Sequence, residues 1–322
     1  MKNKINYFLV VFTLLFAVSC KKNNDPLPVH EPVIPTKIDK TELFTWKFDS
    51  FIVDDRNVTQ VFPGAIFNIK QNGNDLELVS LKDKYTQLPV TASTSVLGNK
   101  SFKDIPSSEK IAAYTKSLPI KSNNESTDYS EDEFKDYNLL KYYLSNNDDV
   151  KLIFEKIGIK TSTRITKKHA ACIFFSSVRF SLDMNLPTKT ELLSIADVDK
   201  LNNTNSVYYV NSVIYGSNTL ILAEADTDYT LLKTALKAAL FKQELTSAQI
   251  QSLSTAKVTF YARAGSEKSF IKVANNLDEI KSINEEFETF NKAAIAYPVS
   301  YSLRSVKNFS LFEHEVKVNI IH

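Results

Sequence analysis

The chain has 322 residues, a formal net charge of +2 and a hydrophobic fraction of 43%. A sizeable core can therefore form, but the excess of Lys and Arg that marks a nucleic-acid-binding surface is missing. Six glycines are far below the average share of about 7%, which excludes a glycine-rich phosphate-binding loop. The length is typical of a targeting segment followed by one or two domains.

The N-terminus has the pattern of an export signal. Lys2 and Lys4 precede the apolar run Tyr7–Ala17, which is too short for an ordinary membrane-spanning helix. The run leads into Ala17-Val18-Ser19-Cys20, which resembles the lipobox of bacterial lipoproteins, with Ala17 in place of the usual Leu. We expect residues 1–20 to be a lipoprotein signal peptide and Cys20 to be the acylated anchor. The alternative is an ordinary signal peptide that is cleaved nearby.

The next twenty residues are predicted to be a tether. Residues 21–40 hold four closely spaced prolines, which favour an extended spacer between lipid and domain. Residues 41–322 are then the folded core. Cys172, the other cysteine, stands among apolar residues and is predicted to be a small buried side chain.

Periodic patterns predict an α+β fold around a mainly antiparallel sheet. Apolar residues recur at helical spacing over 229–240 and 277–290, and Ser108 is a candidate cap for a short helix that ends near Leu118. Ser130 and Glu133 have the spacing of a capping box, which predicts another helix start. Period-two alternation predicts strands over 178–184, 207–215, 220–225, 297–306 and 313–321.

No catalytic or metal-binding motif is present. The four histidines are not in a His-Glu-x-x-His spacing, and no Gly-x-Ser-x-Gly sequence occurs. We therefore expect no enzyme activity, no metal and no cofactor, with an active site of unfamiliar pattern as the alternative.

Residues 248–264 fit two conformations. Even-numbered positions are apolar or small and odd-numbered ones polar apart from Leu253, as in a membrane strand. Gln243–Ser252 also suits a helix, so this segment could switch between the two states. Gly265 begins a turn before a returning apolar strand. The predicted lipid-facing residues are Val258, Phe260 and Ala262, and the predicted pore-facing residues are Lys257, Thr259 and Arg263.

An earlier segment has a weaker form of the same alternation. Val150 and Leu152 are predicted to face lipid, the phase shifts at Lys156, and Ile157 and Ile159 continue the pattern. The alternative for both segments is a pair of ordinary half-buried strands in a soluble sheet, which the pattern taken alone favours.

Five motifs resemble the thiol-activated, or cholesterol-dependent, cytolysins. Phe62-Pro63-Gly64-Ala65-Ile66 is similar to an early Tyr-Pro-Gly-Ala-Leu of that family, and Tyr208–Gly216 is similar to its Tyr-Ile-Ser-Ser-Val-x-Tyr-Gly. The other matching stretches are Pro89–Gly98, Leu277–Ile280 and Ala296–Asn308. Their order and spacing hold over residues 60–320.

The resemblance implies a pore-forming core of the membrane-attack-complex/cytolysin type. Such a core has a twisted central antiparallel sheet flanked by helical bundles, which unfold into membrane hairpins after monomers form a ring. The matching segments here are about 146–172 and 242–272. The resemblance also gives Phe180 the role of an aromatic in the first central strand that engages a neighbouring subunit. Gly216 and Gly265 take hinge or turn positions, although the family's double glycine is Ala264-Gly265 here.

The resemblance ends near Asn308. The family's C-terminal cholesterol-binding domain has a tryptophan-rich loop, whereas Trp46 is the single tryptophan here, so we expect that domain to be absent. The expected function is a pore-forming lipoprotein that acts on a target membrane, as in shortened relatives that attack other bacteria. The expected location is the bacterial outer membrane or cell surface, or the medium after release. Expected partners are target lipid, further copies of the chain and a longer related chain, with no nucleic acid. The alternative is a non-lytic surface adhesin or scaffold with the same fold.

Overall fold

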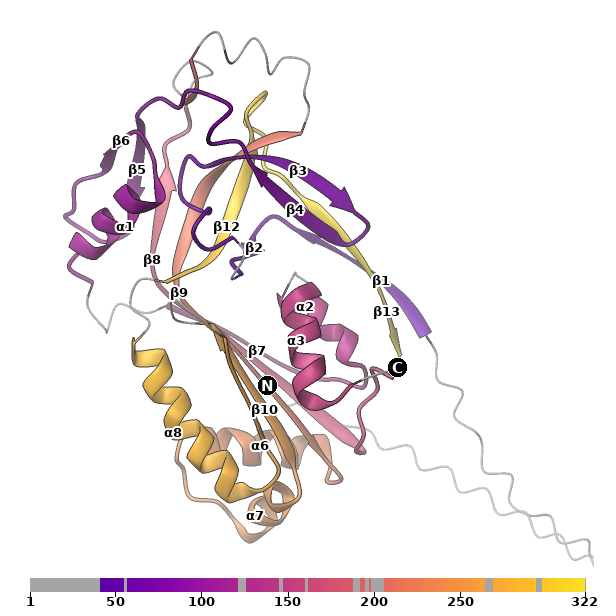
Figure 1. The fold of residues 1–322 in the computed structure, drawn as a ribbon. Coiled ribbons are helices and arrows are strands. Elements are labelled where there is room, and N and C mark those ends of the chain that lie inside the picture. Colours follow the sequence, from indigo (N-terminus) through magenta and orange to yellow (C-terminus); the bar gives the residue numbers. More distant parts are fainter. Residues whose placement is uncertain are drawn as a thin grey trace, which may run out of the picture. The chain divides into compact units, whose positions relative to one another are not determined.

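Two long antiparallel strands, β8 (His169–Met184) and β9 (Val207–Ala225), run through the centre of the fold (Figure 1). The structure is a computed structural model, and its described residues fall in the unit Asp39–His322. They form an 11-stranded sheet and a separate two-stranded ribbon. The described residues are 41–54, 57–120, 126–144, 147–159, 162–187, 192–194, 197, 206–263, 269–293 and 297–321.

The sheet changes partners halfway along β8 and β9. On β9, residues up to Tyr215 pair with β12 (Pro298–Ser305), whereas Asn218–Glu224 pair with β10 (Lys257–Arg263). On β8, the stretch 171–178 pairs with β7 (Ser126–Glu133) and the stretch 182–184 with β5 (Val90–Thr94). We call β7, β10, β11 (Phe270–Ala274) and the adjoining parts of β8 and β9 the hairpin half of the sheet.

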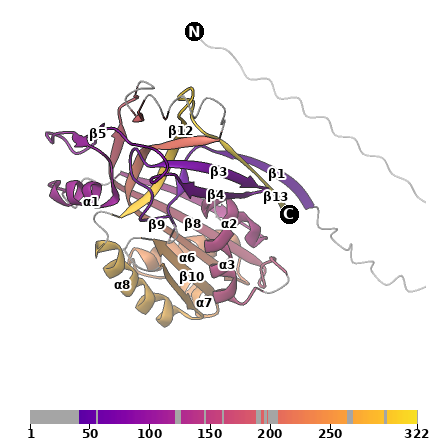
Figure 2. The same ribbon diagram turned by 45° about the horizontal axis from the view of Figure 1, so that its top comes forward.

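Helices cover both faces of the hairpin half (Figures 1 and 2). One face carries η1 (Tyr137–Leu139), α2 (Leu140–Leu144) and α3 (Asn147–Ile157). The other carries α6 (Tyr229–Leu240), α7 (Ser247–Ser254) and α8 (Leu277–Ala293). Because neighbouring residues of a strand point to opposite faces, Cys172 and Leu222 pack on the first layer, while Ala171 and Ile173 pack on the second.

The helices begin where side chains cap them. Asp228 accepts a hydrogen bond from Leu231 N at the start of α6, and Thr246 and Gln249 form a capping box before α7. In α1 (Ser108–Ser117) the cap is Ser107 rather than Ser108. No helix among the described residues has both the length and the apolar character needed to cross a membrane.

The rest of the sheet surrounds a second core. This part of the sheet includes β2 (Phe51–Ile52), β3 (Ile66–Asn72), β4 (Asp75–Ser80) and β6 (Phe102–Asp104). The two-stranded ribbon consists of β1 (Thr41–Phe48) and β13 (His314–Ile321), and its apolar side packs on Leu139. Asn74, in the turn between β3 and β4, hydrogen-bonds both backbone groups of Lys317 and so fixes β13.

The predicted α+β class is confirmed, as are the helices over 229–240 and 277–290. The helix start predicted at Ser130 is wrong, because residues 126–133 pair along β8 and form β7. The strands predicted over 207–215 and 220–225 are one strand, since Gly216 continues the chain without a turn. Residues 1–40, which include Cys20, and Gly265 lie outside the described residues.

Candidate functional site

Four strands of the hairpin half, β7 to β10, each have one end at the same level of the sheet, which we call the terminal row. β7 ends at Glu133, opposite Ala171, and the next backbone amide, of Phe134, donates to Ala170 O at 3.1 Å. Ala170 pairs with Glu224 of β9, and Glu224 pairs with Lys257, the first residue of β10. Two connections therefore leave the sheet from the same row: residues 134–168 between β7 and β8, and residues 226–256 between β9 and β10.

The first connection is held by a buried carboxylate. Glu224 is 1% exposed, and its Oε1 accepts from the hydroxyl of Tyr137, near the start of the connection. Its Oε2 accepts from Thr166 N at 2.6 Å, Thr166 Oγ1 at 2.7 Å and Lys167 N at 2.9 Å, near the end. Burial, and then the charge of Glu224, raise the pKa of the Tyr137 phenol, which keeps it a donor.

Lys257 holds the same connection from the neighbouring strand. Its Nζ donates to Ile157 O at 2.8 Å, the carbonyl at the end of α3. A cation at a helix C-terminus is favourable, because the last carbonyls there have no partner within the helix. A cavity of about 230 Å³ adjoins Glu224 and Lys257 and is also lined by Ser162 and Arg164.

The second connection is attached through Glu131 of β7. Its carboxylate accepts from Lys233 at 2.9 Å and Lys237 at 3.1 Å, both on α6, and from the hydroxyl of Tyr129. Lys237 also lies over the Tyr129 ring, 5.3 Å from its centroid. The hydrogen bonds from Tyr129 and Lys233 lower the pKa of Glu131 from 4.5 to about 2. The carboxylate therefore stays charged under all but strongly acidic conditions.

Acid is expected to weaken this attachment. Because its folded pKa is lowered, Glu131 stabilises the fold fully above about pH 4.5, and the contribution disappears as the pH falls toward about 2. Its side chain is 26% exposed, so we expect Glu131→Gln to lower the free energy of unfolding by only about 1 kcal/mol at neutral pH. Urea unfolding of both proteins over this pH range measures the difference, and a difference that does not shrink in acid would contradict it.

The predicted lipid-facing and pore-facing sets of β10 lie on opposite faces of the sheet. Val258, Phe260 and Ala262 pack beneath α6 and α8. Lys257 lies on the α3 face, and Thr259 and Arg263 alternate with the first set. The expected helical bundle over 242–272 is wrong in part, because residues 257–263 and 270–274 are already strands, and within the described part of this range only 247–254 is helical. Thr259 and Arg263 are buried, and Arg263 donates to Val53 O at 2.7 Å.

The predicted residues of the first segment lie on α3 or beside it. Val150 and Ile157 are buried against the sheet together with Ile153, which shares their helical face. Leu152 and Ile159 are half-buried. The predicted segment 146–172 includes residues 169–172, which already belong to β8. The period-two pattern missed Ile153 because the stretch is a helix in this structure.

Phe180 and Gly216 lie where the sheet changes partners. Phe180 is 1% exposed and stacks on Tyr215 with a centroid distance of 4.5 Å. It is on β8, the second strand of the hairpin half in chain order, not on the first, which is β7. Gly216 is inside β9 rather than in a turn, and a Cβ there would meet Ser177 O at 1.8 Å.

Glu224 was not identified as a site residue from the sequence, although its position in the sequence indicates one. It is the one charged residue in the apolar run Leu220–Ala225, and a charge in such a run must find buried partners.

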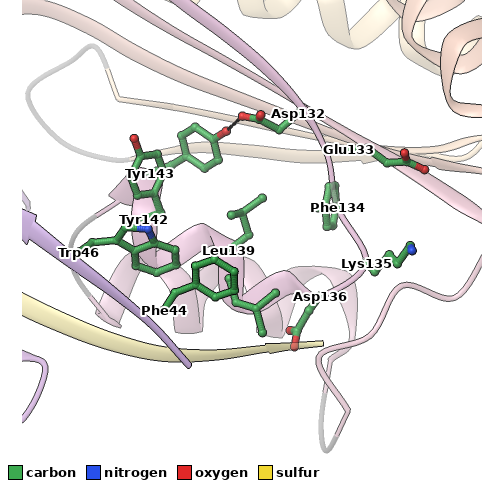
Figure 3. Close-up of a pocket in the computed structure, with 11 residues that line it drawn as sticks. Phe44, Trp46, Asp132, Glu133, Phe134, Lys135, Asp136, Leu139, Tyr142 and Tyr143 are labelled. Atoms are coloured by element: carbon green, nitrogen blue, oxygen red, sulfur yellow. Dashed lines mark hydrogen bonds between the residues drawn. The ribbon is translucent and has the colours of Figure 1, made fainter. Parts of the chain in front are cut away.

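A larger cavity, of about 500 Å³, is lined by residues of both the ribbon and the first connection. Figure 3 shows Phe44, Trp46 and Tyr142 gathered on one side and Asp136 on the other. Asp132, also on its lining, accepts from the hydroxyl of Tyr143. The cavity therefore borders η1 and α2 along the side that faces the ribbon.

The family model of the thiol-activated cytolysins matches residues 120–317, which include both connections and all strands of the hairpin half. No curated protein sequence matches the chain.

Solved structures of cytolysins have a similar fold. A non-hemolytic pneumolysin from Streptococcus pneumoniae strain ST306 matches with a TM-score of 0.66 at 15% identity, and suilysin from Streptococcus suis with 0.67 at 18%. Each match covers 88% of this chain and 65% of the other. Listeriolysin O matches with 0.64 at 16% identity, over 88% of this chain and 62% of its own. The chain thus spans less than two thirds of each of these proteins.

Proposed function

The chain belongs to the thiol-activated cytolysin family, and we propose that copies of it assemble on a membrane and form a pore through residues 134–168 and 226–256. The observation that carries this proposal is the terminal row. Each connection joins two neighbouring antiparallel strands, so each could straighten into a hairpin that continues the existing antiparallel pairing. The connections have 35 and 31 residues, enough for two membrane strands of about 9–11 residues and a turn.

Assembly follows from backbone chemistry. A single hairpin in lipid would leave unpaired N–H and C=O groups along both edges, at several kcal/mol for each group. Pairing between hairpins of neighbouring subunits removes those edges when a ring closes. Further copies of the chain are therefore part of the proposal.

The composition of α6 fits both conformations. Leu232, Leu236 and Leu240 are buried in the folded chain, while Lys233 and Lys237 bond to Glu131. Neighbouring members of each set are four residues apart. Residues at this spacing share one face of a helix and also one side of a strand. In a strand the leucines would lie on one side and the lysines on the other. Even-numbered residues of β9 share the face of Lys257, so the leucines face lipid and the lysines face water when a one-residue bulge between Glu224 and Leu232 shifts the alternation. This avoids a cost of about 2–4 kcal/mol for a lysine held toward lipid at mid-membrane.

Three residues of α6 distinguish the two conformations. In the helix, Thr234 is exposed, whereas Ala235 and Ala239 are buried. In a strand, Thr234 joins the leucine side, and both alanines join the lysine side. An environment-sensitive probe on single cysteines at these positions should therefore become more apolar at 234 and wetter at 235 and 239 when liposomes are added.

The same labelled variants test the alternative. Oligomers on liposomes whose probe signals remain those of the helix would overturn the pore and favour the non-lytic adhesin or scaffold. A probe on Thr45, an exposed residue of β1, serves as a control that should not change on insertion.

In the first connection, Val150, Leu152, Ile157 and Ile159 are the proposed lipid-facing residues. In β10, Val258, Phe260 and Ala262 would continue the lipid side at the base of the second hairpin, and Lys257, Thr259 and Arg263 the pore side. We also propose that Cys20 anchors the exported chain to the outer membrane or cell surface, from which it can be released. A longer related chain is a proposed partner in the attack on target lipid.

A further inference from the structure

We propose that Glu224 and Lys257 form a lock that keeps the first connection folded and makes release of the second connection depend on release of the first. This inference rests on the proposed function, because it concerns the order in which residues 134–168 and 226–256 leave their helices.

Glu224 ties the two ends of the first connection to one point. Tyr137 is four residues beyond the end of β7, and Thr166 and Lys167 are just before β8, yet all three donate to this one carboxylate. If β7 continued as a strand, Tyr137 would lie about 13 Å beyond the terminal row and out of reach of Glu224. The contacts to Glu224 therefore exist only while the connection is folded.

Lys257 adds a third attachment point, at the end of α3. Its ammonium donates to Ile157 O at 2.8 Å, in the middle of the first connection. Charge-assisted hydrogen bonds such as these are stronger than those between neutral groups. The lock thus fixes the start, the middle and the end of one connection.

The coupling arises from where the two residues stand in the chain. Glu224 is two residues before the second connection and Lys257 directly follows it, and they are paired across β9 and β10. When the first connection leaves, Glu224 loses its donors and Lys257 its acceptor. Their surroundings must then rearrange to hydrate the charges. Those surroundings are the ends of the two strands from which the second hairpin would grow.

Hydrogen–deuterium exchange of the soluble monomer tests the lock without any membrane. Glu224→Gln keeps the size of the side chain but removes the charge that its donors share. We expect amide exchange to become at least about tenfold faster in residues 137–159 and also in 229–254. Lys257→Met, which keeps the apolar stem, should accelerate the same two regions to a smaller extent.

Two matched variants distinguish the effect of losing the lock from the effect of losing an ion pair elsewhere. Glu131→Gln removes a carboxylate bonded to α6 and to Tyr129 of its own strand, and it should accelerate 229–254 without changing 137–159. Lys272→Met removes the ion pair between Lys272, on the neighbouring strand β11, and Glu286 of α8, and it should change neither region by a comparable amount. If Glu224→Gln does not fold, Thr166→Val removes one donor to Glu224 and leaves the buried charge in place; it should accelerate both regions less strongly.

Each outcome has one meaning. Faster exchange in 137–159 alone would overturn the coupling, and unchanged exchange in both regions would overturn the lock. Faster exchange in both regions, combined with faster dye release from liposomes, supports the lock as the control of insertion. Faster exchange in both, with no dye release from the parent protein or from any variant, would support the lock and overturn the pore.

Discussion

Gly216→Ala is expected to lower the free energy of unfolding by about 4 kcal/mol or more, which places it among the most damaging single substitutions. A Cβ at this position would meet the backbone oxygen of Ser177 at 1.8 Å and the amide nitrogen of Arg179 at 3.3 Å. Neither atom can move aside as the end of a flexible side chain could. Both belong to β8 at the level where the sheet changes partners, so relief of the clash would separate the two longest strands.

A second glycine provides the control for this experiment. Gly73 lies in the turn between β3 and β4 at φ +60°, and a Cβ there meets nothing within 4 Å. Gly73→Ala should cost about 1–2 kcal/mol, for its left-handed backbone conformation alone. Urea unfolding of the three proteins measures both effects. Equal losses for the two variants would show that β8 and β9 are not in close contact at Gly216.

Cross-linking α6 to β7 is expected to abolish dye release from liposomes. The positions are Glu131 and Lys237, whose side chains are 3.1 Å apart, each replaced by cysteine and joined by a short reducible linker. If residues 226–237 extended β9, position 237 would lie about 40 Å beyond Ala225. A short linker to β7 cannot span that distance, so the second hairpin cannot form. Release should fall at least about a hundredfold and return when the linker is reduced.

The matched control places the same linker where no movement is proposed. Lys70 and Glu77 face each other across β3 and β4, with Nζ and Oε2 3.4 Å apart. Cysteines at these positions, joined in the same way, should leave dye release close to that of the parent protein. Release that persists in the Glu131–Lys237 cross-link would rule out insertion of the second connection.

Much of the fold could be predicted because local patterns and tertiary packing agree. The leucine stripe of α6 and the alternation of β10 are both present as predicted. Ser130 and Glu133 show where local pattern fails. Their spacing fits a helix cap, yet pairing along the whole of residues 126–133 with β8 outweighs one local hydrogen-bond motif. Gly216 misled the prediction for a related reason: a glycine suggests a break, but here it permits close contact between strands.

The candidate site was harder to predict than the fold. Alternation separated Phe260 from Thr259, but it could not show that helices cover both faces, so that Thr259 is also buried. The limits of the two connections depend on which residues pair across the sheet, as Ala170 and Lys257 do with Glu224. Such long-range pairing leaves no trace at fixed spacing in the sequence. The predicted hairpin segments, 146–172 and 242–272, therefore include residues that already belong to β8, β10 and β11 in this structure.

The β1–β13 ribbon has a consequence for the entropy of the chain. Phe48 pairs with His314, so the ribbon closes a loop that contains nearly the whole unit. Closing a loop costs about 0.6 kcal/mol more for every doubling of its length. By contrast, β3 and β4 are joined by a two-residue turn between Asn72 and Asp75, so their pairing avoids nearly all of that cost. The ribbon should therefore be among the last elements to form during folding and among the first to open. Its small apolar cluster and its bonds to Asn74 are what hold it against that entropy.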